Sequence, residues 1–430
     1  MTSSDLTLLV DQLRWDRRRH PYSGRRAYSR AARDLITECE RLLATGEAAV
    51  AVPVLRKAVN RIARALMYLD DSSGIIGDDL RVLMGLYARA CAQVPPSGTS
   101  LARWLVSLAY DGPGWPEIRL REFVPALGDR GLARLAALVD ERAATAESDS
   151  WGEVHATRTL REQLAEVSGD VDRYVAVLAE HLRGVAQYRR IAEVLRDAGR
   201  RVEAIEWARR GLAEKGDHPQ ADRLRDVLVN LLFEQDDASA AVAERSSAFR
   251  RHPTADKYRA FVATAARAGR SPIAAGAWAV GVLTDHVAAN PLFAAELITV
   301  LRSEGRDEDA WQVGLVHRER LLTSQVVELL TVRAATHPGD VVQPYRELIN
   351  DTILDSRDAH RYRRAIALLV TLRHAYQALG ESDSFTEYLQ GLRVEHRRRP
   401  TFIAQLDATD LDDRDVTSGQ RSTRLGRKAP

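Results

Sequence analysis

A short phrase that recurs along the chain constrains the fold more than any other feature of the sequence. Each copy has an apolar helical stretch, a break at Gly or a polar pair, and a second helical stretch with a small residue five positions after the break. The break and small residue are Gly46 and Ala51, Gly199 and Ala204, Asp236 and Ala241, Gly269 and Ala274, and Gly305 and Ala310. The breaks at 199, 236, 269 and 305 are 37, 33 and 36 residues apart, close to the ~34-residue period of tetratricopeptide helix pairs.

This phrase has a physical explanation. Glycine can end the first helix in the left-handed conformation, and a small residue in the second helix lets the two backbones approach closely. Neither helix can bury its apolar stripe alone, so the pairs must stack on one another. Hydrophobic residues make up 45% of the chain and charged residues 28%, as in folded globular proteins. We therefore predict an all-α fold, a tetratricopeptide-like helical-repeat (α-solenoid) array with a helical N-terminal region.

The same patterns divide the chain into segments. An apolar stripe beginning at Val52 predicts an early helix, and Pro53 places its start near residue 52 because proline lacks an amide donor. A last helix pair, broken at Gly380 with Phe385 at the small-residue position, should cap the array. The predicted segments are a basic, partly disordered lead-in (1–27), an N-terminal helical region (28–150), helix-pair repeats (151–345), capping helices (346–406) and a disordered tail (407–430).

The charge of the chain is nearly balanced, with a net charge of +2, so no overall field attracts polyanions. The first 33 residues are locally basic, with eight arginines against three aspartates. A solvated linker is the favoured interpretation of this segment, and contact with nucleic-acid phosphates is the alternative. The candidates for such contact are Arg14, Arg17, Arg18, Arg19, Arg25 and Arg26.

An acidic phrase, LDDSSGIIGDDL, places Asp70, Asp71, Asp78 and Asp79 around a glycine-containing loop between two apolar helices. Their spacing does not match a calcium-binding loop. We favour helix capping, in which Ser72 or Ser73 closes one helix and Asp78 caps the next, with Asp79 near its positive end. Binding of a partner or a cation by the four aspartates is the alternative.

Sequence motifs for catalysis and cofactor binding are absent. The chain has no phosphate-binding loop and no metalloprotease or serine-hydrolase motif, and Gly112 and Gly114 lie in a proline-flanked turn. Cys39 and Cys91 are too few and too far apart for a zinc site or a disulfide framework, and the histidines are isolated. We therefore expect no cofactor, no metal and no enzymatic activity. No signal-like or membrane-spanning apolar run occurs, which predicts a cytoplasmic protein without membrane contact.

Two stretches carry a family resemblance. Residues 54–91 together with 102–117, and the closing residues 362–407, resemble the helical region that follows the zinc element in bacterial SWIM zinc-finger proteins. A Leu-Arg-x-Glu-His phrase at Leu392, Arg393, Glu395 and His396 contributes to the similarity, which covers most of residues 25–407. The CxCx(n)CxH signature of that family is missing. The resemblance therefore implies an accessory helical part without the zinc element.

Two functions remain open from the sequence. The favoured hypothesis is a non-enzymatic scaffold for protein–protein interaction, accessory to a SWIM-type system, because stacked helix pairs build surfaces that hold a peptide or a partner helix. The alternative is a nucleic-acid-associated factor that uses the basic N-terminal segment. The sequence does not identify the protein partner.

Overall fold

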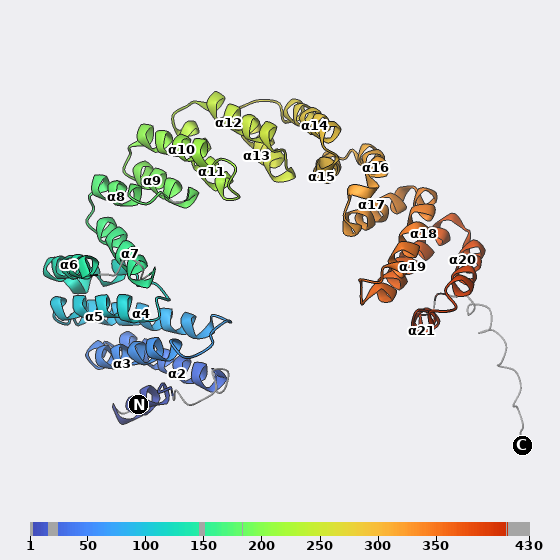
Figure 1. Cartoon of the computed structure of the whole chain (residues 1–430). Coiled ribbons are helices and arrows are strands. Elements are labelled where there is room, and N and C mark those ends of the chain that lie inside the picture. The colour runs from blue at the N-terminus through green and yellow to red at the C-terminus, as the bar shows by residue number, and fades with distance from the viewer. Residues whose placement is uncertain (1–2, 16–24, 146–150, 183, 410, 412–430) are drawn as a thin grey trace, which may run out of the picture. The chain divides into compact units, whose positions relative to one another are not determined.

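The computed structural model describes residues 3–15, 25–145, 151–182, 184–409 and 411. Every regular element in these residues is helical, and they contain no strand (Figure 1). The chain divides into two compact units, Met1–Leu231 and Leu232–Pro430. The predicted all-α, tetratricopeptide-like helical-repeat fold is confirmed.

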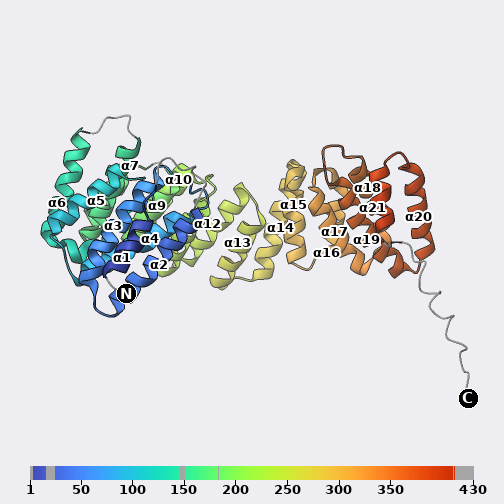
Figure 2. The ribbon, with the colours of Figure 1, turned by 90° about the horizontal axis from the view of Figure 1, so that it is seen from below.

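The helices are divided between the two units. The first unit contains α1 (Ser3–Gln12), α2 (Arg25–Ala44), α3 (Ala48–Leu66), α4 (Ile75–Gln93), α5 (Gly98–Asp111), α6 (Leu120–Thr145), α7 (Trp151–Val167), α8 (Val171–Ala179), α9 (Val185–Asp197), α10 (Arg201–Lys215) and most of α11 (Ala221–Glu234). The second unit contains α12 (Ala238–Arg251), α13 (Ala255–Arg267), α14 (Pro272–Ala289), α15 (Ala294–Ser303), α16 (Asp307–Val316), α17 (Thr323–Thr336), α18 (Pro338–Leu354), α19 (Arg361–Leu379), α20 (Ser382–Glu395) and α21 (Pro400–Ala408), with the 3₁₀ turns Pro291–Phe293 and Arg318–Arg320. Several successive helices lie side by side within a unit, as α9 and α10 or α18 and α19 do (Figures 1 and 2).

The predicted helix breaks adopt the conformation that the sequence required. All six have a positive φ between 58° and 78°: Gly46, Gly199, Asp236, Gly269, Gly305 and Gly380. In each case the residue after the break donates its amide to the carbonyl five positions earlier, as Arg200 N does to Leu195 O at 2.8 Å. This bond closes the end of the first helix, because it satisfies a carbonyl that has no partner within the helix.

The small residues need one correction. Ala51, Ala204, Ala241 and Ala310 are buried as expected, but Ala274 is exposed and its neighbour Ala275 is buried instead. The reason lies in the turn before α14, which is one residue longer than the other turns because Ser271 caps the helix ahead of Pro272. The buried position is therefore the fourth residue of the second helix. Phe385 holds the same place in α20 and is also buried.

Two adjacent aspartates in the turn between α11 and α12 should respond oppositely to substitution. Asp236 is the one described non-glycine residue with positive φ, so Asp236→Gly should raise the free energy of unfolding by about 0.5–1 kcal/mol. Asp237 accepts a hydrogen bond from Ala240 N at 2.9 Å, so Asp237→Ala should lower the free energy of unfolding by about 1 kcal/mol. Urea unfolding of both variants measures the effects. A change of the free energy of unfolding in the same direction in both variants would contradict the roles assigned to Asp236 and Asp237.

The N-terminal lead-in contains a helix that the sequence patterns did not reveal. Leu6, Val10 and Leu13 are buried in the core of the first unit, where α1 contacts α2 and α3. The Asp11 carboxylate lies 2.7 Å from Arg61 Nη2, and this guanidinium lowers the pKa of Asp11. Helix α2 then begins at Arg25, before the border expected at residues 27 and 28. The expected border at 345 and 346 falls inside α18.

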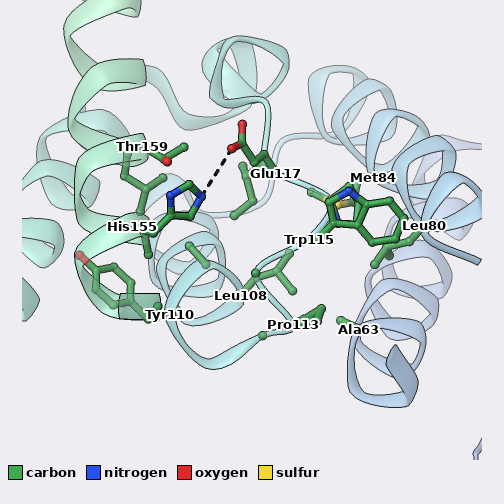
Figure 3. Close-up of a pocket in the computed structure, with 18 of the residues that line it drawn as sticks. Ala63, Leu80, Met84, Leu108, Tyr110, Pro113, Trp115, Glu117, His155 and Thr159 are labelled. Atoms are coloured by element: carbon green, nitrogen blue, oxygen red, sulfur yellow. Dashed lines mark ion pairs between the residues drawn. The ribbon is translucent and has the colours of Figure 1, made fainter. Parts of the chain in front are cut away.

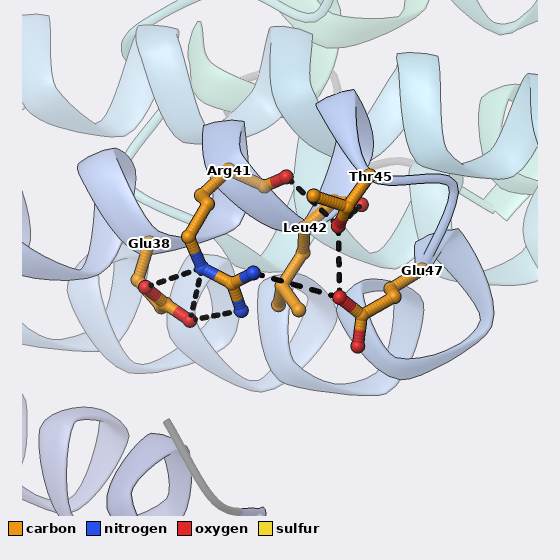
Figure 4. A network of polar contacts seen from close by, with 5 residues as sticks. All are labelled: Glu38, Arg41, Leu42, Thr45 and Glu47. Carbon is orange, nitrogen blue, oxygen red and sulfur yellow. Dashed lines mark hydrogen bonds and ion pairs between the residues drawn. The ribbon is translucent and has the colours of Figure 1, made fainter.

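A polar network ties the end of α2 to the start of α3 (Figure 4). Arg41 donates to Glu38 at 2.7–3.1 Å, and its Nη1 lies 3.5 Å from Glu47. Thr45 Oγ1 donates to Glu47 at 2.8 Å. The two carboxylates raise the pKa of Arg41. Because the network is exposed, we expect it to orient the Gly46 turn and to contribute little to stability.

Among the helices that the structure describes, none combines the length and the apolar character that crossing a lipid bilayer requires. The expected disordered tail from residue 407 lies outside the described residues, apart from residues 407–409 and 411.

Candidate functional site: a pocket beside Trp115

A pocket of about 170 Å³ lies within the first unit. It is bounded by α3, α4, the loop between α5 and α6, and the first turns of α7 (Figure 3). Apolar side chains predominate on its walls, among them Leu80, Met84, Leu108, Pro113 and Ile118. We call it the Trp115 pocket, because this ring forms the wall beside α4.

Trp115 occupies its place because residue 77 has no side chain. A Cβ atom on Gly77 would lie 1.6 Å from Cζ3 and 1.9 Å from Cη2 of the indole ring. The Arg81 guanidinium lies 5.7 Å from the ring centroid, within the range of a cation–π contact. The ring is still 41% exposed. The Trp115 ring thus packs on α4 in the space beside Gly77, and part of the indole remains accessible at the pocket.

The opposite wall comes from α7. Trp151 stacks on His155 with ring centroids 5.1 Å apart and an interplanar angle of 2°. Trp151 is 76% exposed. The Tyr110 hydroxyl lies 2.8 Å from Thr157 Oγ1, which links the end of α5 to this helix. Two exposed indole rings, Trp115 and Trp151, therefore belong to the same pocket.

A carboxylate lies at the rim between the two walls. Glu117 Oε1 is 3.6 Å from His155 Nε2 (Figure 3), and Arg158 Nη2 is 3.2 Å from His155 Nδ1. An arginine can only donate, so Nδ1 accepts and the imidazole hydrogen lies on Nε2, which faces Glu117. The 3.6 Å separation exceeds a normal hydrogen bond. The Glu117 side chain is 58% exposed.

The acidic loop is organised differently from the prediction. The residue that caps α4 is Asp71, which accepts from Ile76 N at 3.1 Å and Gly77 N at 2.8 Å. Asp78 lies in the first turn of α4 and pairs with Arg81. The prediction of Asp78 as the cap was wrong. The chain turns at Gly74, which has a left-handed conformation, and the Asp71 carboxylate therefore lies against the first backbone amides of α4, which have no partner within the helix.

The other two aspartates also have partners within the chain. Asp70 accepts from Ser72 N at 3.3 Å and from Ser72 Oγ at 3.2 Å. Asp79 is buried, accepts from Ser29 Oγ at 2.7 Å and lies 3.5 Å from Arg33 Nε. Asp79 thus connects α4 to α2. Binding of a partner by these carboxylates remains a prediction. No group of three or more possible metal-ligating residues occurs in the described part of the chain.

The basic lead-in is only partly described. Arg14 is exposed and lies 3.8 Å from Asp11. Arg17, Arg18 and Arg19 fall outside the described residues, as do the side chains of Arg25 and Arg26 at the start of α2. Their contact with nucleic acid remains a prediction.

The sequence patterns did not identify Trp115, Glu117, Trp151 or His155 as site residues. The phrase YDGPGWPE was interpreted as a rigid turn. One available signal was the tryptophan itself, because a large apolar ring inside a loop of glycines and prolines must either pack elsewhere or be exposed. Its partner Gly77 lies in the acidic phrase, and no local pattern connects the two phrases.

Comparisons with solved structures return helical-repeat proteins at low similarity. The yeast protein Tom70 is 13% identical with a TM-score of 0.25, covering 95% of this chain and 100% of that chain. Human IFIT1 in a dimer with PPP-AAAA is 13% identical with a TM-score of 0.23, covering 92% and 95%. A circular tandem repeat protein is 15% identical with a TM-score of 0.18, covering 94% and 98%. No curated protein matches the chain.

The family comparison overturns the resemblance to SWIM zinc-finger proteins. The model that matches is that of a family of unknown function, DUF6880, over residues 29–405. This match spans nearly all of the stretches on which the resemblance rested. The resemblance was wrong because Ala-, Leu- and Arg-rich helices with similar spacing arise in many helical repeats. The accessory role in a SWIM-type system is withdrawn with it. Since the match covers most of its length, this chain belongs to the DUF6880 family.

Proposed function

We propose that this chain is a non-enzymatic helical-repeat scaffold that binds partner proteins, and that the Trp115 pocket receives one ring-sized apolar side chain of a partner. The observation that carries the proposal is the size and lining of the pocket. Small-molecule sites commonly enclose about 300–1,000 Å³, whereas an apolar cavity of about 150 Å³ accommodates a benzene ring. The volume of about 170 Å³ suits a single phenylalanine-sized group.

The exposed rings beside the pocket support a polypeptide as the occupant. Trp151 is 76% exposed and Trp115 is 41% exposed. Tryptophan is among the residues most enriched at the energetic centres of protein interfaces. Rings that remain accessible around a small apolar pocket can cover the backbone and neighbouring side chains of a bound segment.

Fluorine NMR of the full chain tests this proposal. The seven tryptophans are labelled with 5-fluorotryptophan, and the Trp115 and Trp151 signals are assigned with Trp115→Phe and Trp151→Phe. The probe is the peptide Ac-Gly-Ser-Phe-Ser-Gly-NH2, compared with the same peptide carrying Ala in place of Phe. We expect the Phe peptide to shift both signals saturably and the Ala peptide to leave them unchanged.

Surface variants give a second measurement. Trp151→Ala removes a largely exposed ring and should weaken binding of the Phe peptide about tenfold, as loss of an interface anchor does. Leu8→Ala is the matched control, because Leu8 is 61% exposed and does not line the pocket. Equal shifts with the Phe and Ala peptides, or unchanged affinity in Trp151→Ala, would refute the proposal.

A further inference from the structure

We infer that the Trp115 pocket selects an aromatic residue flanked by a basic residue, with Glu117 as the group that recognises the positive charge. This inference rests on the proposed function and specifies the chemistry of the partner. Three features carry it: the ring-sized apolar volume, the exposed carboxylate at its rim, and the fixed orientation of His155 beside that carboxylate.

Glu117 is positioned to accept hydrogen bonds from a ligand. Within the described part of the chain, no hydrogen bond reaches its carboxylate, and its partner His155 Nε2 lies at 3.6 Å. Arg158 Nη2 lies 3.2 Å from Nδ1 on the other side of the same ring, which holds the imidazole beside the carboxylate without a hydrogen bond of normal length to it. The carboxylate oxygens therefore keep their capacity to accept hydrogen bonds at the rim.

The nearby positive charges are engaged elsewhere. Arg158 Nε lies 3.7 Å from Glu162, Arg81 pairs with Asp78, and Arg119 lies 3.3 Å from Glu122. A guanidinium or ammonium group that arrives with the ligand would form a charge-assisted hydrogen bond with Glu117 without displacing an existing one.

The position of Glu117 determines how close the aromatic and the basic side chain of the partner must be to each other. Glu117 belongs to the same loop as Trp115 and lines the same pocket as Trp151. A side chain that fills the apolar volume thus brings the adjacent residues of its own chain to the rim, where the carboxylate lies (Figure 3). The partner segment is therefore a phenylalanine, tyrosine or tryptophan next to an arginine or lysine.

Three peptides separate the contributions of ring and charge. The probes are Ac-Gly-Arg-Phe-Arg-Gly-NH2, Ac-Gly-Glu-Phe-Glu-Gly-NH2 and Ac-Gly-Arg-Ala-Arg-Gly-NH2, titrated against the fluorine-labelled full chain. The basic Phe peptide should bind about tenfold more tightly than the acidic one, which is the effect of one charge-assisted hydrogen bond. The Ala peptide should not shift the Trp115 and Trp151 signals. Because the chain carries a net charge of +2, general attraction would favour the acidic peptide instead.

A matched pair of variants assigns the preference to Glu117. Glu117→Gln should reduce the preference for the basic over the acidic Phe peptide from about tenfold to about threefold or less. The neutral Phe peptide, Ac-Gly-Ser-Phe-Ser-Gly-NH2, should bind as it does to the unmodified chain. Glu122→Gln is the control, because Glu122 is a similarly placed carboxylate on α6 that pairs with Arg119 and does not line the pocket. The control should keep the preference.

The possible outcomes distinguish the inference from the proposed function. If the neutral Phe peptide binds but the basic peptide is not preferred, or the preference survives in Glu117→Gln, the inference fails and the scaffold proposal stands. If no Phe peptide shifts the two tryptophan signals, both fail. If free 2-phenylethylamine binds as tightly as the basic Phe peptide, the pocket serves small aromatic amines, which overturns the assignment to a polypeptide partner.

Discussion

Replacement of Gly77 by alanine is expected to displace Trp115 and to abolish peptide binding at the pocket. The new Cβ atom would lie 1.6–1.9 Å from two carbons of the indole, far inside van der Waals contact. The ring must therefore move away from residue 77. The clash costs about 1–3 kcal/mol, and the higher helix propensity of alanine offsets about 1 kcal/mol of this. The chain should thus remain folded while the pocket loses one wall.

Fluorine NMR measures this effect directly. In Gly77→Ala the Trp115 signal should move toward the position of a solvent-exposed tryptophan, and the Phe peptide should bind at least tenfold more weakly, as expected when an anchor pocket is lost. Gly85→Ala is the matched control in the same helix. Its Cβ would meet only Glu122 Oε2 at 3.6 Å, and it should stabilise the first unit by about 0.5–1 kcal/mol. An unchanged Trp115 signal in Gly77→Ala would show that the position of the ring does not depend on the space beside Gly77.

Gly211→Ala is expected to produce a large loss of stability in the first unit. Gly211 is a buried residue of α10, and an added Cβ would lie 2.6 Å from Cβ and Cγ of Tyr188 and 2.7 Å from Cδ2 of Leu224. These contacts come from α9 and α11, so the substitution forces three helices apart. The Cβ of Tyr188 is close to the backbone and cannot rotate away. Overpacking of this kind costs about 1–3 kcal/mol.

Urea unfolding followed by far-ultraviolet circular dichroism measures this loss. The higher helix propensity of alanine offsets about 1 kcal/mol of this cost, so we expect the free energy of unfolding to fall by about 1–2 kcal/mol in Gly211→Ala. It should rise by about 0.5–1 kcal/mol in Gly85→Ala, although both variants exchange the same two residue types. The displacement should also perturb the hydrogen bond from the Tyr188 hydroxyl to Glu214 Oε2, which is 2.5 Å long. Equal stability of the two variants would show that the helices can absorb the added methyl group.

Sequence and structure agree most closely at the helix breaks. The sequence patterns located six residues that all adopt left-handed conformations, because the end of a helix depends on a few consecutive residues. The same patterns misplaced one buried alanine at α14, where an additional turn residue moved the register by one. They also missed α1, whose apolar residues Leu6, Val10 and Leu13 form too short a stripe to be recognised alone.

The amino-acid sequence by itself determined the helical repeats, their breaks and the close approach of paired helices, since these follow from backbone conformation and side-chain periodicity over short distances. Only the tertiary structure decided the site. Gly77 and Trp115 are separated by 38 positions (115 − 77), and Glu117 and His155 by 38 as well (155 − 117). Such pairs meet because α4, the α5–α6 loop and α7 pack around one core, and packing depends on the whole set of buried surfaces rather than on neighbouring residues.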